Sequence, residues 1–254
     1  MKNKIIAIVE ARMSSKRLPG KVMLKIKNET ILSILINRIK NSKQIDDIVV
    51  ATTKNSVDQK IVNFCAKSKI NCFRGSEQNV TSRVYNCAKK FNANIIVQLT
   101  GDNPLIDYRI IDRAISIFKK NKFDFVTNNN FGDYNDKTPN GMIVSVFRKS
   151  DLKKNLKFCK TKALKEHSSL FFYREGKNKY KIKNFNTNFN LFNGTKPRLT
   201  LDYNKDLKLI KKIYINLSKK YSYNFSYKSI IQFLNSNKKL LKINSFIKQK
   251  KPKI

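Results

Sequence analysis

The stretch IIAIV at residues 5–9, followed by ARMSSKRLPGK at residues 11–21, decides the fold predicted for this chain. The apolar run is typical of a buried parallel strand. The loop after it carries four cations, two serines, a proline and a glycine. Small residues let backbone N–H groups approach phosphate oxygens, while arginine supplies forked donors and lysine a point charge. The spacing is neither that of a Walker loop nor that of a dinucleotide fingerprint, so we predict a polyphosphate loop of another type.

Short apolar runs alternate with helical periodicity through the first half of the chain. We predict strands at 4–9, 47–52, 71–73 and 94–99, with helices at 30–41, 57–68 and 80–91 between them. This alternation predicts an α/β fold with a mostly parallel, Rossmann-like sheet and helices on both faces. The later elements are predicted as strands at 142–147, near 180–185 and at 198–202, one or two helices within 149–173, and a helix at 204–217.

No internal repeat or hinge-like linker divides the 254 residues. We therefore predict one domain over residues 1–235, with a substrate-side flap around 128–195 where turn-forming residues begin. Lysines are locally dense only in residues 236–254, which we interpret as a solvated basic helix and tail.

The formal net charge of +37 raises the question of a nucleic-acid partner. Lysine is spread along the whole chain together with abundant asparagine and isoleucine, and no nucleic-acid-reading motif is present, so the composition does not favour that role. Four cysteines without a CxxC pair and a single histidine argue against zinc and fit a reducing compartment. No apolar run is long enough to cross a membrane, and the apolar N-terminal run is too short for a signal peptide. We expect a cytoplasmic protein without a membrane partner.

Two aspartates follow predicted strands and are candidates for binding a metal. Asp102 comes after the strand at 94–99, and Asp202 closes the strand predicted at 198–202. Because ligands of parallel sheets bind beyond the carboxyl ends of the strands, the two acids could share one Mg²⁺ with a polyphosphate. Each could instead cap the helix that follows it, and the pattern alone leaves both readings open.

Three segments in this order and spacing resemble one family. ARMSSKRLPGKV, TGDNPLID and RLTLDYNKDLKLI are similar to the cytidylyltransferase superfamily that makes CMP-activated acidic sugars. The closest group is the spore coat polysaccharide biosynthesis (SpsF-like) type, a relative of the CMP-ketodeoxyoctonate and CMP-neuraminate synthetases. The resemblance covers roughly residues 4–217 and implies a nucleotide-diphospho-sugar transferase (GT-A-like) sheet.

The resemblance also implies a site. Asp102 and Asp202 would be the Mg²⁺ ligands, and Arg12 and Lys21 would act with them on the phosphates. The residues implied in binding CTP and the sugar are Ala11, Arg12, Ser14, Ser15, Arg17, Lys21, Arg74, Gly75, Arg83, Gly141, Glu166 and His167. From the residues alone, Arg74 and Arg83 could equally be solvated helix-end charges, and His167 a helix residue bonded to Glu166.

The resemblance implies Mg²⁺-dependent transfer of CMP from CTP to a hydroxyl of an acidic acceptor, with release of pyrophosphate. It also implies a homodimer, which is common in the superfamily. Glu10, Ser82 and Asn140 depart from the Gln, Asp and Asp of the pattern, which puts the acceptor in doubt more than the nucleotide. The alternatives are a GT-A-type glycosyltransferase, a nucleic-acid-binding basic protein and a catalytically weak paralogue. The first is disfavoured because Asp102-Asn103-Pro104 lacks the second acid of the D-x-D pair that such enzymes typically present.

Overall fold

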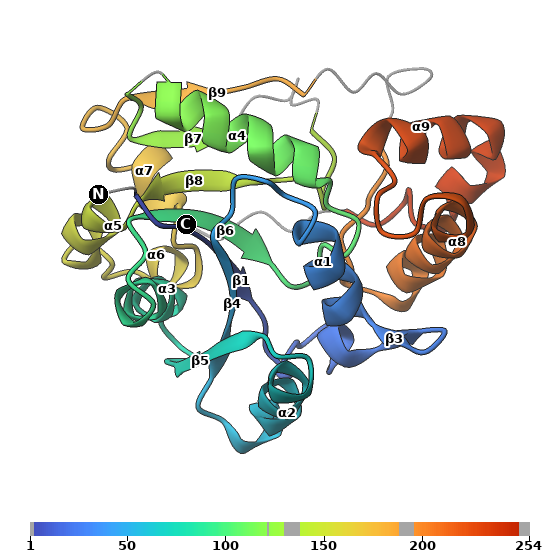
Figure 1. The fold of residues 1–254 in the computed structure, drawn as a ribbon, viewed down its shortest axis with the longest axis horizontal. Helices are drawn as coiled ribbons and strands as arrows, with labels where there is room; N and C mark the ends of the chain where they lie inside the picture. The colour runs from blue at the N-terminus through green and yellow to red at the C-terminus, as the bar shows by residue number, and fades with distance from the viewer. Residues whose placement is uncertain (1–2, 121, 130–137, 188–195, 249–254) are drawn as a thin grey trace.

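The computed structural model describes residues 3–120, 122–129, 138–187 and 196–248. Seven strands form one sheet in the order β5-β4-β1-β6-β8-β7-β9 (Figure 1). They are β1 (Ile5–Glu10), β4 (Asp47–Thr53), β5 (Asn71–Gly75), β6 (Ile95–Thr100), β7 (Phe125–Thr127), β8 (Ser145–Arg148) and β9 (Ile182–Asn184), and a separate hairpin joins β2 (Lys25–Ile26) to β3 (Glu29–Thr30).

The described α-helices and 3-10 helices lie between and after these strands. The α-helices are α1 (Ile31–Ile39), α2 (Gln59–Lys67), α3 (Val80–Lys90), α4 (Tyr108–Lys120), α5 (Lys149–Leu156), α6 (Lys162–Glu166), α7 (Leu170–Tyr173), α8 (Asn204–Tyr221) and α9 (Tyr227–Ser236). Short 3-10 helices occur at Lys21–Met23, Ser56–Asp58 and Lys238–Ile243.

The central strand β1 pairs in parallel with β4 on one side and β6 on the other. β4 is also parallel to β5, whereas β8 runs antiparallel to both β6 and β7. The mostly parallel α/β sheet predicted from the sequence is confirmed. Because β1 lies where the strand order reverses, the loop that follows it stands at the position where such sheets bind ligands.

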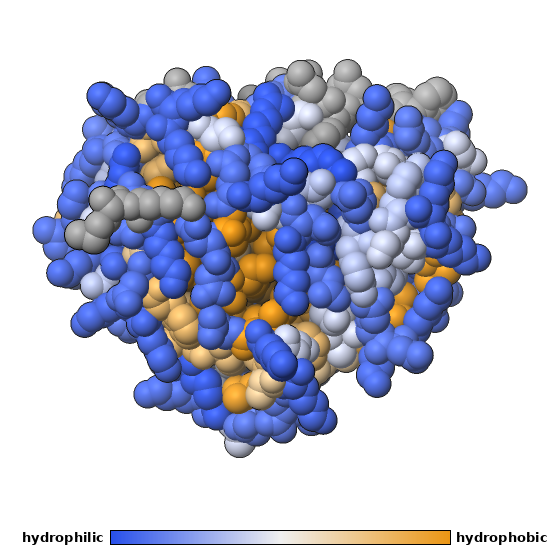
Figure 2. All heavy atoms as spheres, viewed as in Figure 1, coloured by the Kyte–Doolittle hydropathy of each residue, from blue (hydrophilic) through white to orange (hydrophobic). Residues whose placement is uncertain are grey.

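Each face of the sheet has its own apolar core, as expected for strands buried on both sides. Ile5, Ala7 and Val9 pack in the core that also contains residues of α1, α2, α4 and α8. Ile6 and Ile8 point to the other face and pack in the core formed with α3 and α7. Hydrophilic residues cover most of the face seen in Figure 2, and apolar residues show between them near the centre of the view.

The strand predicted at 198–202 is wrong. This segment is extended but joins no sheet, because it makes only isolated backbone bonds on either side. The Leu199 N–H donates to the Asn140 carbonyl at 2.8 Å, and the Leu201 N–H donates to the Asp102 carbonyl at 2.8 Å. The second bond places the start of α8 directly beside the loop that follows β6.

The strand predicted at 142–147 begins later, as β8 (Ser145–Arg148). The side chain of Asn128 takes the ladder bonds at its beginning: its amide donates to the Met142 carbonyl at 2.8 Å, and its oxygen accepts the Val144 N–H at 2.9 Å. A side-chain amide therefore replaces a strand partner there. The helical region 149–173 also divides further than predicted, into α5, α6 and α7.

The basic C-terminal segment differs from the solvated helix that we predicted. Lys238–Ile243 is a 3-10 helix, and Leu240, Leu241 and Ile243 pack against the main core. Asn244 is buried, with 2% of its surface exposed. Parts of the predicted flap (130–137 and 188–195) and of the tail (249–254) lie outside the described residues. No helix in the described part of the chain is long and apolar enough to cross a membrane.

The backbone at Gly141 leaves no room for a side chain, which can be tested by substitution. Its φ is +102°, and a Cβ atom there would lie 2.5 Å from the backbone carbon of Leu199. We expect Gly141→Ala to lower the free energy of unfolding by roughly 2–5 kcal/mol, because backbone strain and a backbone clash add. Urea unfolding measures this. Gly20→Ala is the matched control: its φ is +68°, but its Cβ would meet only the flexible end of Met13, so a loss of about 1–2 kcal/mol is expected. Equal losses in the two variants would contradict the close approach at Gly141.

Candidate active site

The loop after β1 is fixed in shape by β4 and the turn that follows β4. The Ala11 N–H donates to the Ala51 carbonyl at 3.2 Å, and the Met13 N–H donates to Asp58 Oδ1 at 2.7 Å. Asp58 is fully buried and also accepts the Thr53 N–H. At the other end of the loop, the Gly20 N–H donates to the Met13 carbonyl at 2.8 Å. The loop is therefore closed upon itself before Lys21 begins the next 3-10 helix.

Lys21 joins the two predicted metal-binding acids. Its Nζ lies 2.5 Å from Asp102 Oδ2 and 2.8 Å from Asp202 Oδ1. Only 9% of Lys21 and 2% of Asp202 are exposed, so this is a buried ion cluster rather than a surface pair. Residues from the loop after β1, the loop after β6 and the start of α8 thus meet at one ammonium group.

Asp202 is surrounded by three cations. Besides Lys21, Arg17 donates to Oδ1 at 2.7 Å, and Arg198 donates to Oδ2 at 2.7 Å. Arg198 also bonds Asp206 Oδ1 at 3.0 Å, and Asp206 Oδ2 accepts the Asp202 N–H at 3.0 Å. Every oxygen of Asp202 therefore has a charged donor, which is the condition under which a buried carboxylate is stable.

These contacts shift two pKa values in opposite directions. Burial alone would raise the pKa of Asp202, but Lys21, Arg17 and Arg198 together outweigh it and hold the pKa below its ordinary value. Burial alone would lower the pKa of Lys21, but Asp102 and Asp202 outweigh it and raise that pKa. Both groups are therefore charged at neutral pH.

The position of Asp102 depends on the close approach of two strand ends. The Gly101 N–H donates to the Glu10 carbonyl at 2.8 Å, and a Cβ at Gly101 would lie 3.0 Å from that carbonyl oxygen. Asp102 Oδ1 accepts the Thr100 hydroxyl at 2.7 Å, which leaves Oδ2 for Lys21. The sequence TGD therefore directs one carboxylate oxygen at Lys21, at the end of the loop that follows β1.

The rest of the loop after Asp102 is held by the buried Arg38 of α1. Its guanidinium donates to the carbonyls of Leu105 and Ile106 and, from the α8–α9 connection, to those of Tyr223 and Phe225. Burial lowers the pKa of Arg38 to about 10, so it stays charged at neutral pH.

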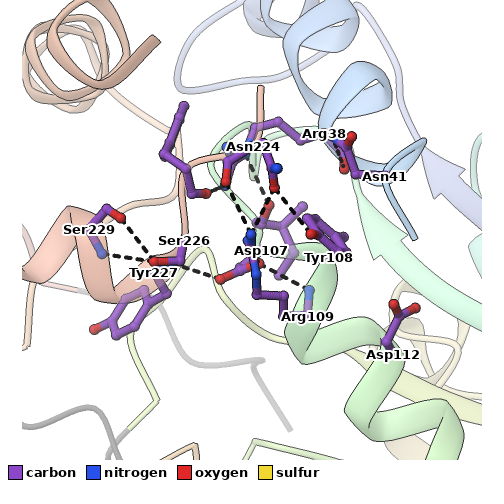
Figure 3. Close-up of polar contacts among 12 residues, drawn as sticks. Arg38, Asn41, Asp107, Tyr108, Arg109, Asp112, Asn224, Ser226, Tyr227 and Ser229 are labelled. Atoms are coloured by element: carbon purple, nitrogen blue, oxygen red, sulfur yellow. Dashed lines mark hydrogen bonds and ion pairs between the residues drawn. The ribbon is translucent and has the colours of Figure 1, made fainter. Parts of the chain in front are cut away.

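Asp107 adds a second tie between the same segments. Figure 3 shows its carboxylate between Arg109 and Tyr227: Oδ2 accepts the Tyr227 N–H at 2.7 Å, and Oδ1 accepts the Arg109 N–H at 3.0 Å. Arg109 in turn donates to Asn224 Oδ1 at 2.8 Å. The segment carrying Asp102 is therefore fastened to the C-terminal helices.

Arg12 and Ser14, predicted to bind the nucleotide, meet at Glu77 instead of at the Lys21 cluster. The Ser14 hydroxyl donates to Glu77 Oε1 at 2.5 Å, and Arg12 lies 3.7 Å from the same oxygen. The Ser14 and Asn55 bonds hold the pKa of Glu77 below its ordinary value. Ser15 remains in the same loop, where its N–H donates to the Met13 carbonyl.

Glu10, at the end of β1, forms a third group on the α3 face of the sheet. Its Oε1 accepts the Gln98 amide at 2.8 Å and the Ser168 hydroxyl at 3.3 Å. Arg83 is 2% exposed, donates to the Ser76 carbonyl and attracts the Glu10 charge. Burial nevertheless raises the pKa of Glu10. The departure at position 10 thus places a constrained carboxylate at the switch in strand order.

Other predicted site residues have different surroundings. Arg74 donates to the carbonyls of Thr53, Lys54 and Asn55, so its donors stabilise the turn after β4 and do not reach the Lys21 cluster. Gly75 ends β5 against Arg83, whose Cγ would lie 2.8 Å from an added Cβ.

The remaining predicted residues lie farther along the chain. Gly141 packs on the backbone of Leu199. Glu166 and His167 are exposed at the end of α6, and the hydroxyl of their neighbour Ser168 donates to Glu10 of β1.

Sequence reasoning missed several residues that support the loop after β1 or the two acids. These are Asp58, Glu77, Arg198, Asp206 and Asn244. Asp206 alone had a local signal: it is the third residue of α8 and accepts the Tyr203 N–H, as in a capping box. Arg198 pairs with Asp202 only four residues away, but the segment between them is not helical and the spacing alone gave no signal. Asp58, Glu77 and Asn244 bond residues 45, 63 and 38 positions away in the sequence, which no local pattern encodes. Asn244, for example, donates to Asp206 Oδ1 at 2.8 Å and to the Arg198 carbonyl at 3.0 Å.

The donor set fits a hard divalent cation. Among the described residues, no group of three or more His, Cys, Asp or Glu side chains could hold a metal. The chain instead directs two carboxylate oxygens, Asp102 Oδ2 and Asp202 Oδ1, at one cationic group, the Lys21 ammonium. Two carboxylates completed by phosphate oxygens and water are a typical Mg²⁺ environment.

The mostly parallel seven-stranded sheet with its helices is an α/β nucleotidyltransferase fold, and it gathers cationic and carboxylate side chains beside the loop after β1. The family model described as Cytidylyltransferase matches residues 6–242, and the chain belongs to that family. It is therefore a nucleotidyltransferase.

Individual relatives agree with this assignment. The chain is 39% identical over 248 residues to the protein MJ1063 of Methanocaldococcus jannaschii, covering 97% of each. It is 28% identical over 218 residues to the spore coat polysaccharide biosynthesis protein SpsF of Bacillus subtilis, covering 84% of this chain and 87% of SpsF. Among solved structures, a cytidylyltransferase from Leptospira borgpetersenii superposes with a TM-score of 0.85 at 32% identity, covering 98% of this chain and all of that one. The resemblance to the SpsF-like group is confirmed.

Asn244 lies beyond the residues matched by the family model, and its role in supporting Asp206 is testable. We expect Asn244→Ala to lower the free energy of unfolding by about 1–3 kcal/mol, because it removes a buried hydrogen bond to a charged group. Urea unfolding measures the loss. Ser245→Ala, an exposed neighbour, should change stability little. A stability of Asn244→Ala equal to that of Ser245→Ala would show that the contact contributes nothing.

The low pKa of Asp202 predicts a pH dependence. A carboxyl with a depressed pKa stabilises the fold above its ordinary value of about 3.9, and this contribution is lost as the pH falls through the lower folded-state pKa. Asp202→Asn should cost about 3–5 kcal/mol at pH 7. We expect the difference in free energy of unfolding between wild type and variant, measured by urea unfolding, to shrink below pH 4. The gap for Glu175→Gln, an exposed control, should be small throughout; an Asp202→Asn gap that stays constant down to pH 3 would contradict the assignment.

Proposed function

We propose that this cytidylyltransferase transfers CMP from CTP to a hydroxyl of an acidic sugar or similar acceptor, for the synthesis of a surface polysaccharide or glycan. The observation that carries the proposal is the cluster in which Lys21 contacts both Asp102, after β6, and Asp202, before α8, while Arg17 contacts Asp202. These groups match the charges that the reaction requires: cations for a triphosphate and two carboxylates for Mg²⁺. The SpsF relative carries polysaccharide biosynthesis in its name, which supports the proposed process.

In the proposed reaction, the acceptor hydroxyl oxygen forms a bond to the α-phosphorus of CTP. The bond from that phosphorus to the bridging oxygen breaks, pyrophosphate leaves, and the hydroxyl proton is lost. Such a transfer needs positioning and charge neutralisation more than covalent participation by the protein. Mg²⁺, when bound, would neutralise phosphate charge.

The chain's own residues have distinct parts in this proposal. Arg17 and Lys21 would bind the phosphates, and Asp102 and Asp202 would hold the metal. Arg17 Nη1 is buried without a hydrogen-bond partner among the described residues, which suits a donor intended for a ligand. Arg12 and Ser14 lie earlier in the same loop, at Glu77, and would bind the nucleotide there.

Glu10 would help to select the acceptor. With one oxygen held by Gln98 and Ser168, this carboxylate suits an acceptor that presents a hydroxyl or N–H donor near β1. The acidic group of the acceptor would then lie elsewhere, toward arginine or lysine side chains. The homodimer and the cytoplasmic location remain predictions from the sequence.

Nucleotide binding gives the first test. We expect CTP with Mg²⁺ at about 100 times its dissociation constant to stabilise the protein by about 2.7 kcal/mol, a rise in melting temperature of roughly 5–10 °C. UTP, GTP and ATP should give smaller shifts, and Asp102→Asn should lose the part that depends on Mg²⁺. Differential scanning fluorimetry measures all of these, with Lys16→Met as a control that removes an exposed charge from the same loop.

The outcomes separate the alternatives. A preference for CTP would justify an acceptor screen by pyrophosphate release. Stabilisation by UDP- or GDP-sugars alone would replace the proposal with a glycosyltransferase. Binding to nucleic acid that weakens steeply with salt, without any nucleotide preference, would favour the charge-driven reading.

A further inference from the structure

The Lys21 ammonium occupies the carboxylate oxygens that a bound metal would need. Lys21 Nζ is within 2.8 Å of one oxygen from each of the two acids, Asp102 and Asp202. Asp102 and Asp202 would hold Mg²⁺ through the same oxygens that the Lys21 ammonium contacts. Two cations on the same buried oxygens would repel each other strongly, so the metal and the ammonium would exclude each other.

The charges around this contact are balanced. Three cations (Arg17, Lys21 and Arg198) face three carboxylates (Asp102, Asp202 and Asp206). A divalent cation arriving alone would place two further positive charges in a balanced, buried cluster. A divalent cation that arrives with a triphosphate is accompanied by more negative charge than it neutralises. The phosphates can then pair with Lys21 and Arg17.

The side chain of Lys21 can change position while the backbone of its loop stays fixed. Its backbone begins the 3-10 helix Lys21–Met23, directly after Gly20, and the loop behind it is closed by the bond from Gly20 to Met13. The side chain has a flexible four-carbon stem that ends in a single point charge. Its ammonium can therefore leave the carboxylates for a phosphate while its Cα atom stays in place.

We propose that Lys21 is an internal counter-cation that the metal–nucleotide pair displaces. It holds Asp102 and Asp202 together until the metal takes its place, and it then binds the triphosphate. Metal and CTP consequently bind cooperatively. Removal of Lys21 tightens binding of the metal alone and weakens binding of CTP. This inference rests on the proposed function for its second half, whereas its first half concerns only the two acids.

Titration with Mn²⁺, followed by the electron paramagnetic resonance signal of the free ion, tests the exchange. Lys21→Met should bind Mn²⁺ without nucleotide about tenfold more tightly than wild type, within the usual range of couplings between sites. CTP should tighten Mn²⁺ binding to wild type by a similar factor and should have little effect on the variant. Lys16→Met removes the same charge from the same loop without contacting the acids, and it should behave like wild type.

The results discriminate between this inference and the proposed function. Unchanged or weaker Mn²⁺ binding by folded Lys21→Met overturns the exchange, as does a wild type that binds CTP but binds no Mn²⁺ in its presence. A wild type that binds no CTP in isothermal titration overturns the proposed function, while the comparison without nucleotide still decides the exchange. Circular dichroism verifies folding, and Lys21→Gln, which keeps a donor between the acids, is used if the methionine variant does not fold.

Discussion

One buried ammonium group connects the parts of this enzyme. Lys21 belongs to the loop after β1, yet it bonds an acid 81 residues away and another 181 residues away. Buried charges of this kind are stable only when every partner is present, since loss of one leaves another unpaired in a medium that solvates it poorly. The strand ends, the loop and the start of α8 must therefore be positioned together, and much of the remaining structure does this.

The support comes from the C-terminal part of the chain. Arg38 fastens the loop that carries Asp102 to the connection between α8 and α9 through four carbonyls. Asn244 reaches back to Asp206 and Arg198, which hold Asp202. Both ties use side chains with several donors to satisfy backbone groups that would otherwise be buried without partners. The helices that follow the sheet thus form part of the wall of the site.

Sequence reasoning predicted the parts of this arrangement that leave a local signal. The alternating apolar strands gave the sheet, and the position of TGD after an apolar run placed Asp102 correctly at a strand end. It failed where a side chain replaces a backbone partner: Asn128 shortens β8, and the 198–202 segment bonds two loops instead of a strand. Sequence reasoning also could not show that the Arg74 guanidinium donates to backbone carbonyls, because those bonds depend on the turn after β4. The support by Arg38 and Asn244 is entirely a matter of tertiary contact.

The charge of the whole chain differs from the charge of its candidate site. The net charge is +37, but around Asp202 the described cations and carboxylates balance. The surplus charge lies outside that cluster, where it raises the local concentration of any polyanion without distinguishing among them. If the proposed function holds, selection falls to the balanced cluster, because a polyanion would enter it favourably only with a divalent cation for the two acids. Long-range attraction and local discrimination would then be separate properties that reside in different residues.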